Sequence, residues 1–214
     1  MKKIAIVAAG GRVANKVISE AVNRGFDVTA FGRKDENHTQ AQTYITYIKK
    51  DIFDLTKEDL AGFDAVVDAF GAWTEETLPQ HSTTLAHLCD IVSGTQVRLL
   101  IVGGAGSLYV NPEHTMTLSE TPDFPNAFQP LANAMAKALG ELRQRNDVQW
   151  TYISPAADFQ ADGKRTELYL RGGEELKLND RGESIISYAD YAIAIVDEIE
   201  IGNHRQERIS IVRA

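Results

Sequence analysis

The chain has 214 residues, of which 43% are hydrophobic and 24% charged, a composition typical of a globular protein with one substantial core. Its net charge of −8 argues against a broad surface for nucleic acid. A single cysteine, Cys89, excludes an intrachain disulfide and a cysteine-based metal cluster, and no pair among the five histidines has the spacing of a zinc motif. We therefore expect no bound metal and no nucleic-acid partner.

The first predicted elements form one βαβ unit. Residues 4–8 are a continuous apolar run, which is typical of a parallel strand buried on both faces and is too short for a secretory signal or a membrane span. Apolar residues then recur at helical spacing over 13–22, and Gly25 stands where that helix should end. A second strand is predicted at 27–31. Without an export signal or a membrane segment, the protein is expected to be cytoplasmic.

The alternation of strands and helices continues along the rest of the chain. Strands separated by helices favour an α/β Rossmann fold with a doubly wound, mainly parallel sheet. No repeat or linker divides the sequence, so residues 1–214 are expected to form a single domain. Irregular stretches at 104–126 and 155–182 follow strands, where such folds place their ligand loops. The remaining strands are predicted at residues 44–48, 65–70, 97–102, 149–153 and 208–212, and the remaining helices at 81–92, 128–142 and 188–199.

A turn of small residues joins the first strand to the first helix. Its sequence, AAGGRVA over residues 8–14, suits a dinucleotide pyrophosphate, which must approach the backbone amides at a helix N-terminus closely. This turn makes the chain a candidate NAD(P)-binding domain, with small substrate-side loops toward the C-terminus. A plain tight turn without a ligand is the alternative. The cofactor contacts predicted in the turn are Ala9, Gly10, Gly11, Arg12 and Val13.

The spacing of the turn is similar to the G-x-x-G-x-x-G fingerprint of extended and atypical short-chain dehydrogenase/reductases. Only Gly11 matches a glycine position, because alanines stand at the first and third positions. Ala14 is acceptable there, since that position needs only close packing of helix and strand. Ala8 is the more serious departure, and it is tolerable if its φ is negative.

The end of the second strand bears on the choice of cofactor. NAD-binding proteins usually present an acid there for the ribose 2′-hydroxyl, but this corner reads FGRK over residues 31–34. Arg33 could pair with a 2′-phosphate, with Arg12 nearby, so NADP(H) is favoured over NAD(H). The alternative is that Arg33 is a solvated loop charge. The acids Asp35 and Glu36 follow directly and weaken the argument for a 2′-phosphate site.

Two residues after the third predicted strand offer a contact for the adenine. Asp51 and Ile52 stand at the place where such proteins flank this base. Asp51 is equally expected as a helix cap or a turn residue. The sequence leaves both interpretations open.

Segments beyond the turn carry a family resemblance. They read VGGAGSL over 102–108, WTYISPA over 150–156, RT over 165–166 and SIISYADYA over 184–192. In order and spacing they resemble the atypical short-chain dehydrogenase/reductases known as NADH-flavin reductases, which are relatives of NmrA-like NAD(P)-binding proteins. The resemblance covers nearly all of the chain and implies an NAD(P)-binding Rossmann fold.

The resemblance also implies site residues outside the turn. Ser107 would take the place of the active-site Ser/Thr of the family. Ser187 and Asp190, by contrast, look like a helix N-cap pair. Six residues would border the cofactor, with Ala69, Phe70 and Gly71 near its phosphates and ribose, and Ser154, Pro155 and Ala156 near the nicotinamide.

The wider relatives use a Tyr-x-x-x-Lys pair on the helix after the fifth strand. Here Lys137 is the best-fitting lysine, but Asn133 stands four residues before it, so a proton relay to a simple ketone lacks its phenolic acid. Hydride transfer to a flavin or a similar conjugated acceptor tolerates this loss, because a delocalised ring takes up the charge. Ser107 and Lys137 are the candidate catalytic residues, although a surface position is an equal expectation for Lys137.

Two aromatic residues follow strands and could contact a flat substrate. Trp73 and Tyr109 are candidates for an aromatic wall, with a role as packing residues as the alternative. His81 falls on the apolar face of its helix and is expected to be a buried packing residue near the cleft. Cys89 is expected to be an inert core thiol.

Two functions of different classes remain. The favoured one is an NAD(P)H-dependent oxidoreductase that passes hydride to a planar small molecule such as a free flavin or quinone. The alternative is a non-catalytic NADP(H)-binding redox sensor of the NmrA-like type, which the missing tyrosine and the eroded glycines favour. A sugar-nucleotide epimerase is disfavoured, because the chain lacks the tyrosine and is short for a separate substrate domain.

Overall fold

One eight-stranded sheet organises the fold. The computed structural model describes residues 2–34 and 44–214, and its main sheet has the strand order β3-β2-β1-β4-β5-β6-β10-β8. Neighbouring strands are parallel except for the last pair, β10 with β8. The α/β Rossmann prediction is therefore confirmed. The strands are β1 Lys3–Val7, β2 Asp27–Gly32, β3 Thr46–Lys49, β4 Ala65–Asp68, β5 Arg98–Val102, β6 Gln149–Ser154, β8 Tyr169–Gly172 and β10 Glu207–Arg213.

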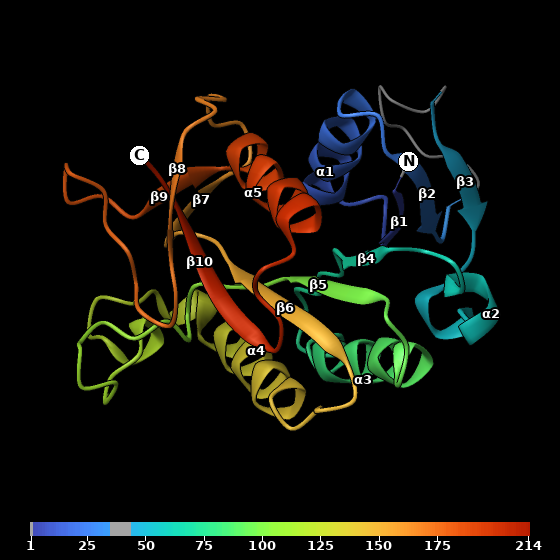
Figure 1. The fold of residues 1–214 in the computed structure, drawn as a ribbon. Coiled ribbons are helices and arrows are strands. Elements are labelled where there is room, and N and C mark those ends of the chain that lie inside the picture. Colours follow the sequence, from blue (N-terminus) through green and yellow to red (C-terminus); the bar gives the residue numbers. More distant parts are fainter. Residues whose placement is uncertain (1, 35–43) are drawn as a thin grey trace.

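Helices cover both faces of the sheet. Figure 1 shows α1 (Arg12–Asn23) and α5 (Tyr188–Ile201) on one face, and α3 (Gln80–Val92) and α4 (Gln129–Leu142) on the other. A short helix, α2 (Lys57–Leu60), follows β3. Because side chains alternate across a strand, each strand feeds two cores. In β1, for example, Ile4 and Ile6 pack with α1 and α5, whereas Ala5 and Val7 face α3 and α4.

The C-terminal third differs from its prediction. The stretch 155–182, expected to be irregular, contains β7 (Asp158–Gln160) and β8, and β7 pairs in parallel with β9 (Ile185–Ser187) as a separate two-stranded sheet. These strands are three or four residues long, and β7 and β8 are only partly buried, so they lack the apolar run that marks a central strand. The predicted fourth strand also ends earlier, at Asp68, which places Ala69 and Phe70 in a loop.

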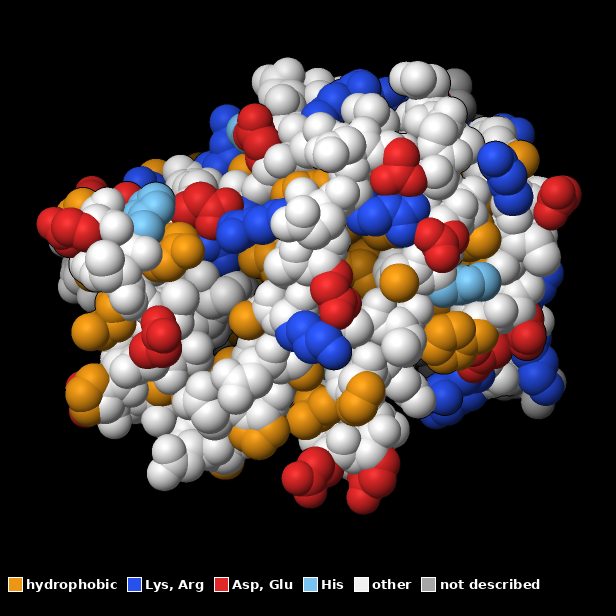
Figure 2. Space-filling view, turned by 90° about the horizontal axis from the view of Figure 1, so that it is seen from below, with side chains coloured by type: hydrophobic (Ala, Val, Ile, Leu, Met, Phe, Trp, Pro, Cys, Tyr) orange, Lys and Arg blue, Asp and Glu red, His pale blue; other side chains and the backbone are white. Residues whose placement is uncertain are grey.

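The surface carries mixed charge. Figure 2 shows acidic and basic side chains interspersed over the face seen from below, with small separate apolar patches. Within residues 2–34 and 44–214, no helix combines the length and apolar character needed to cross a bilayer. Over the same ranges, no group of histidine, cysteine and acidic side chains could hold a metal ion.

Candidate dinucleotide-binding site

The carboxyl ends of the parallel strands meet along one edge of the sheet. β1 lies between β2 and β4, so the connections from β1 and β4 leave in opposite directions at this point of the sheet. Doubly wound folds bind ligands in the crevice outside such a reversal. The structure brings the turn after β1 and the loop after β4 together here, because a Cβ on Gly11 would lie 3.8 Å from the carbonyl oxygen of Ala69.

The glycine turn is open on the side away from the sheet. A Cβ on Gly10 would meet no atom within 4 Å, and one on Gly11 would meet nothing closer than 3.6 Å. Neither residue has a positive φ. The packing of the chain therefore does not require glycine at either position, whereas close approach of a phosphate would.

No side chain neutralises the positive N-terminal end of the dipole of helix α1. Gly11 is its N-cap and offers no side-chain acceptor, and the first turn contains no acidic residue. The first amides of a helix lack intrahelical partners and carry partial positive charge. An anion such as a pyrophosphate fits this end of α1, so the residues of the turn fit the predicted cofactor.

Two residues of the turn differ from expectation. Ala8 has φ +58°, in the left-handed region, and not the negative value that would make alanine comfortable there. The backbone amide of Ala9 donates to the carbonyl oxygen of Phe31 at 2.9 Å, so this amide is bonded within the sheet and is not free for a phosphate. Ala9 supports the turn as a buried residue, and the amides at the start of α1 are the ones that face outward.

The side chains of Arg12 and Val13 point in different directions. Arg12 is exposed and donates to both carboxylate oxygens of Asp162, at 2.9 and 2.8 Å. Its guanidinium also lies 5.9 Å from the ring centre of Tyr188, at the start of α5. Val13 is partly buried against the α1–α5 core. Arg12 therefore stands at the rim of the turn, where it can reach either Asp162 or a bound anion.

The corner after β2 is basic and exposed. The side chain of Arg33 is 80% exposed, and its Nε lies 4.0 Å from a carboxylate oxygen of Asp51. Asp51 also accepts a hydrogen bond from the amide of Phe53, so it caps the short helix at Ile52–Asp54. A helix cap is one of the two roles predicted for Asp51. Asp35 and Glu36 lie outside the described residues.

The side chain of Tyr47 fills the space beside Gly32 at the end of β2. A Cβ on Gly32 would lie 2.6 Å from the hydroxyl of Tyr47, which itself donates to the carbonyl oxygen of Lys34. A side chain at position 32 would therefore have to displace the hydroxyl end of Tyr47. Position 32 carries glycine and not the acid that would bind a ribose 2′-hydroxyl.

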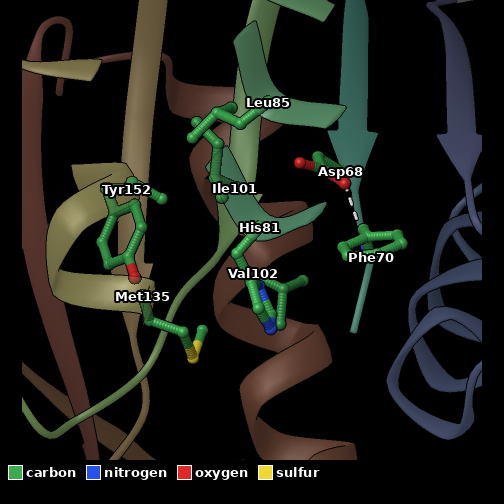
Figure 3. Close-up of a pocket in the computed structure, with 9 residues that line it drawn as sticks. Asp68, Phe70, His81, Leu85, Ile101, Val102, Met135 and Tyr152 are labelled. Carbon is green, nitrogen blue, oxygen red and sulfur yellow. Dashed lines mark hydrogen bonds between the residues drawn. The ribbon is translucent and has the colours of Figure 1, made fainter. Parts of the chain in front are cut away.

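A small cavity lies beside the end of β4. It has a volume of about 20 Å³, enough for about one water molecule. Figure 3 shows Asp68 and Phe70 on one side, Tyr152 and Met135 on the other, and His81 between them. Asp68 accepts a 3.0 Å hydrogen bond from the amide of Phe70 and is 4% exposed. Burial raises the pKa of its carboxyl to about 6, more strongly than this hydrogen bond lowers it.

His81 and Cys89 are buried, as expected. The ring of His81 contacts Phe70 edge-on at 5.5 Å, and its Nε2 lies 3.1 Å from the carbonyl oxygen of Ala72. Burial lowers the pKa of His81, so the ring stays neutral at physiological pH. Burial raises the pKa of the Cys89 thiol to about 12, which keeps it unreactive.

The loop after β5 is shaped by close packing. A Cβ on Gly103 would lie 2.3 Å from the ring of Tyr152, and one on Gly106 would lie 2.8 Å from Ala132 of α4. Close packing of the loop against β6 and α4 therefore requires both glycines. The hydroxyl of Tyr152 accepts a 3.3 Å hydrogen bond from the amide of Gly104.

Ser107 is held by a buried arginine from β10. The Nη1 of Arg208 donates at 2.9 Å to both the hydroxyl and the carbonyl oxygen of Ser107, and its Nη2 pairs with the carboxylate of Glu174. Because arginine only donates, the hydroxyl hydrogen of Ser107 remains available. The residues that line the cavity at Asp68 do not include Ser107.

The end of β6 lies where the resemblance places the nicotinamide. Ser154, Pro155 and Ala156 are buried, and the hydroxyl of Ser154 has no hydrogen-bond partner among the described residues. A buried unpartnered hydroxyl is uncommon and suits a polar ligand group. Gly71, after β4, is exposed at the same edge of the sheet.

Three predicted residues are not brought to the cavity. The side chain of Lys137 is 71% exposed, and its Nζ lies 3.8 Å from Glu141. Trp73 is also exposed, and Tyr109 stacks on His114 with ring centres 4.4 Å apart. Their roles stay predictions.

Sequence reasoning missed Asp68, Tyr152 and Arg208. Asp68 left a signal, since it is an acid at the end of an otherwise apolar strand. Arg208 lies 101 residues from its partner Ser107, so no local pattern could reveal the contact. A larger hollow of about 470 Å³ has Trp150, Arg143 and Arg208 among its lining, but none of the predicted site residues.

Comparison with known proteins agrees with this geometry. Residues 8–200 match the family model described as NAD(P)H-binding. The chain belongs to this family. The match begins in the glycine turn and ends in α5, so it includes every loop at the carboxyl edge.

Relatives span the whole chain. The uncharacterised protein YwnB of Bacillus subtilis is 41% identical over 210 residues, which are 98% of each chain. A solved structure from Streptococcus pneumoniae, provisionally named an NADH-flavin reductase, is 50% identical with a TM-score of 0.95 and full coverage of both chains. A structure from Bacteroides thetaiotaomicron, provisionally named an epimerase, is 35% identical with a TM-score of 0.87 and coverage of 99% and 97%.

Proposed function

We propose that the protein is a cytoplasmic NAD(P)H-dependent oxidoreductase that transfers hydride to a planar small molecule such as a free flavin or quinone. The observation that carries the proposal is the open glycine turn, where Gly10 and Gly11 leave space above the uncapped start of α1. Family membership supports the cofactor, and the name of the Streptococcus pneumoniae relative supports the acceptor class.

Each loop at the carboxyl edge of the sheet would bind a different part of the cofactor. The amides at the start of α1 and the guanidinium of Arg12 would bind the pyrophosphate, with Ala69, Phe70 and Gly71 beside it. Ser154, Pro155 and Ala156 would hold the nicotinamide, which supplies the hydride when bound. Only the Nη2 of Arg12 donates to Asp162, so the Nε and Nη1 of the same guanidinium would donate to the pyrophosphate.

The acceptor would lie over the loops after β4 and β5. Trp73 and Tyr109 are proposed to contact its flat ring, and Ser107 to donate a hydrogen bond to it. Lys137 would contribute only if its exposed side chain turned toward the ribose, so the proposal does not depend on it.

A turnover assay tests the function. The protein should oxidise NADPH in the presence of FMN or a small quinone, followed by loss of nicotinamide absorbance. Gly11→Leu should abolish this activity and weaken NADPH binding at least about tenfold, because the side chain would fill the phosphate space. Gly173→Leu is the control, since a Cβ there meets no atom within 4 Å and Gly173 is not a predicted site residue. Equal activity of the two variants would refute the assigned site.

NADP(H) is proposed as the preferred cofactor. The exposed side chain of Arg33 after β2, and glycine in place of an acid at position 32, support this preference. Arg33→Asp should weaken NADPH binding about tenfold or more, measured by titration calorimetry, and leave NADH binding little changed. Equal losses for both nucleotides would contradict a 2′-phosphate contact.

A redox sensor is the second candidate. Asn133 in place of the tyrosine and the strained Ala8 favour it. Tight NADPH binding without turnover on flavins and quinones would support the sensor over the enzyme.

A further inference from the structure

The hollow of about 470 Å³ lies between the C-terminal end of α4 and the starts of β6 and β10. Its volume is in the range of small-molecule sites, whereas the cavity beside Asp68 holds about one water molecule. Three strands, β4, β5 and β6, separate β10 from β1 in the sheet, and Figure 1 shows α4 and β10 apart from α1. The hollow is therefore distinct from the glycine turn.

Two arginines that line the hollow share one acid. The Nη2 of Arg143 lies 2.6 Å from the Oε2 of Glu174, and the Nη2 of Arg208 pairs with the same oxygen. Burial lowers the pKa of Arg208 more strongly than the carboxylate of Glu174 raises it. One carboxylate balances only one guanidinium, so these three side chains carry one positive charge without a counter-charge.

The other charged residues of the lining do not balance this charge. Arg145 pairs with Asp90 and Asp147, and these two acids do not line the hollow. Glu207 directly precedes Arg208 in β10. Because side chains alternate across a strand, the carboxylate of Glu207 lies on the opposite face of the sheet from the guanidinium of Arg208. A negative group that enters the hollow would therefore supply the counter-charge.

Two buried residues of the lining carry donors without a partner. Trp150 is 3% exposed and Arg208 is 4% exposed. The indole Nε1 of Trp150 and the Nε of Arg208 have no hydrogen-bond acceptor within residues 2–34 and 44–214. Buried N–H groups are nearly always paired, and an unpaired one costs free energy. A ligand group with several acceptor oxygens would satisfy both donors.

We propose that this hollow is a second ligand site, which binds a small molecule through a carboxylate or phosphate group. The oxyanion accepts hydrogen bonds from the Nε1 of Trp150 and the Nε of Arg208, and from the free donors of Arg143 at the exposed rim. The chain as a whole has a net charge of −8, so the affinity for an anion comes from this local positive charge. The site does not depend on a dinucleotide at the glycine turn.

The fluorescence of Trp150 reports on the site directly. The chain has two tryptophans, and Trp73→Phe leaves Trp150 as the single one. This variant is titrated at constant ionic strength with inorganic phosphate, glycerol 3-phosphate and succinate. We expect a saturable change of emission with at least one of them, with a Kd below about 10 mM. Tighter binding of succinate would assign a carboxylate ligand, and tighter binding of the phosphates a phosphate ester.

Two further substitutions in this background should change the Kd in opposite directions. Arg143→Gln removes a donor and should weaken binding about fivefold, whereas Glu174→Gln removes the competing carboxylate and should strengthen binding about fivefold. Arg181→Gln is the matched control, since Arg181 also lies beside a single acid, 3.8 Å from Glu183, and should leave the Kd unchanged. Circular dichroism verifies that each variant folds, and Arg143→Gln decides alone if Glu174→Gln does not.

Three results would overturn the second site. The first is no saturable response to any of the three anions, or a Kd that is the same in Arg143→Gln and Arg181→Gln. The second is loss of the response in Gly11→Leu, which would assign the anion to the glycine turn. The third is a wild-type dimer that Arg143→Gln dissociates, detected by analytical ultracentrifugation, because a second copy of the chain would then cover the hollow.

Discussion

At the scale of single residues, the site combines two kinds of unfavourable feature. Ala8 occupies a left-handed conformation, and Asp68 is a buried carboxyl without a cation. Both lie at the point where β1 and β4 end. Strain and unpaired charge persist in a folded protein when the surrounding structure enforces them, and they concentrate at functional sites.

Replacing Ala8 by glycine tests the strain. Ala8→Gly should raise the free energy of unfolding by up to about 1 kcal/mol, because glycine adopts φ +58° without a clash of its Cβ. Chemical denaturation would measure the change. Ala61→Gly, at a position with φ −66°, is the control and should lower stability instead. A destabilised Ala8→Gly protein would show that the turn is not strained.

At the scale of elements, the start of α5 fixes the C-terminal loops. Ser187 caps α5 by accepting the amide of Asp190, as the sequence predicts. The side chain of Asp190 does not complete the cap. It reaches across to the loop before β8 and accepts hydrogen bonds from the amides of Thr166 and Glu167. The predicted N-cap pair is therefore correct for Ser187 and wrong for Asp190.

Removal of the two side chains should have unequal effects. Ser187→Ala should cost about 1 kcal/mol of stability, typical of a lost N-cap. Asp190→Ala should cost about 2 kcal/mol, because it leaves two partly buried amides without their acceptor. Trypsin should also cut the native Asp190→Ala protein faster after Lys164 and Arg165, while Ser187→Ala stays close to the wild type. Equal cleavage of the two variants would show that Asp190 does not hold the loop.

At the scale of the whole molecule, a buried ion cluster joins β5 to the end of α5. Arg98 donates to Glu198 at 2.7 Å, and the Nδ1 of His204 lies 2.6 Å from the other carboxylate oxygen. Burial acts to raise the pKa of Glu198, but the hydrogen bonds from His204 and Arg98 outweigh it and lower the pKa below 4.5. The cluster lies at the amino ends of the strands, away from the proposed site.

This cluster predicts the acid sensitivity of the fold. A lowered pKa means that the folded state binds the proton less readily than the unfolded state, so the stabilisation is complete above pH 4.5 and is lost as pH falls below it. Glu198→Gln should cost about 3 kcal/mol at pH 7 and should flatten the dependence below pH 4.5. Thermal unfolding between pH 3 and 7 measures both. A wild-type profile with the same slope as the variant would exclude Glu198 as its origin.

Most of the central sheet could be predicted, because each of its strands has a local pattern of apolar residues. The continuous apolar runs around β1, β5 and β6 mark buried parallel strands, and the residues between them repeat at helical spacing. β7, β8 and β9 could not be found in this way, since they are short and get their stability from partners distant in sequence. The same holds for the site. Gly11 could be predicted from the glycine turn in which it lies, whereas no local motif pointed to Arg208.

The sequence by itself determined the fold class, the order of the main elements and the place of the open turn, because hydrophobic period and glycine position are local properties. Only the tertiary structure decided what surrounds each polar group. It placed Arg208 on Ser107 across 101 residues, joined Asp190 to Thr166, and left Asp68 buried without a cation. Burial and electrostatics depend on which distant segments meet, and no stretch of sequence carries that information alone.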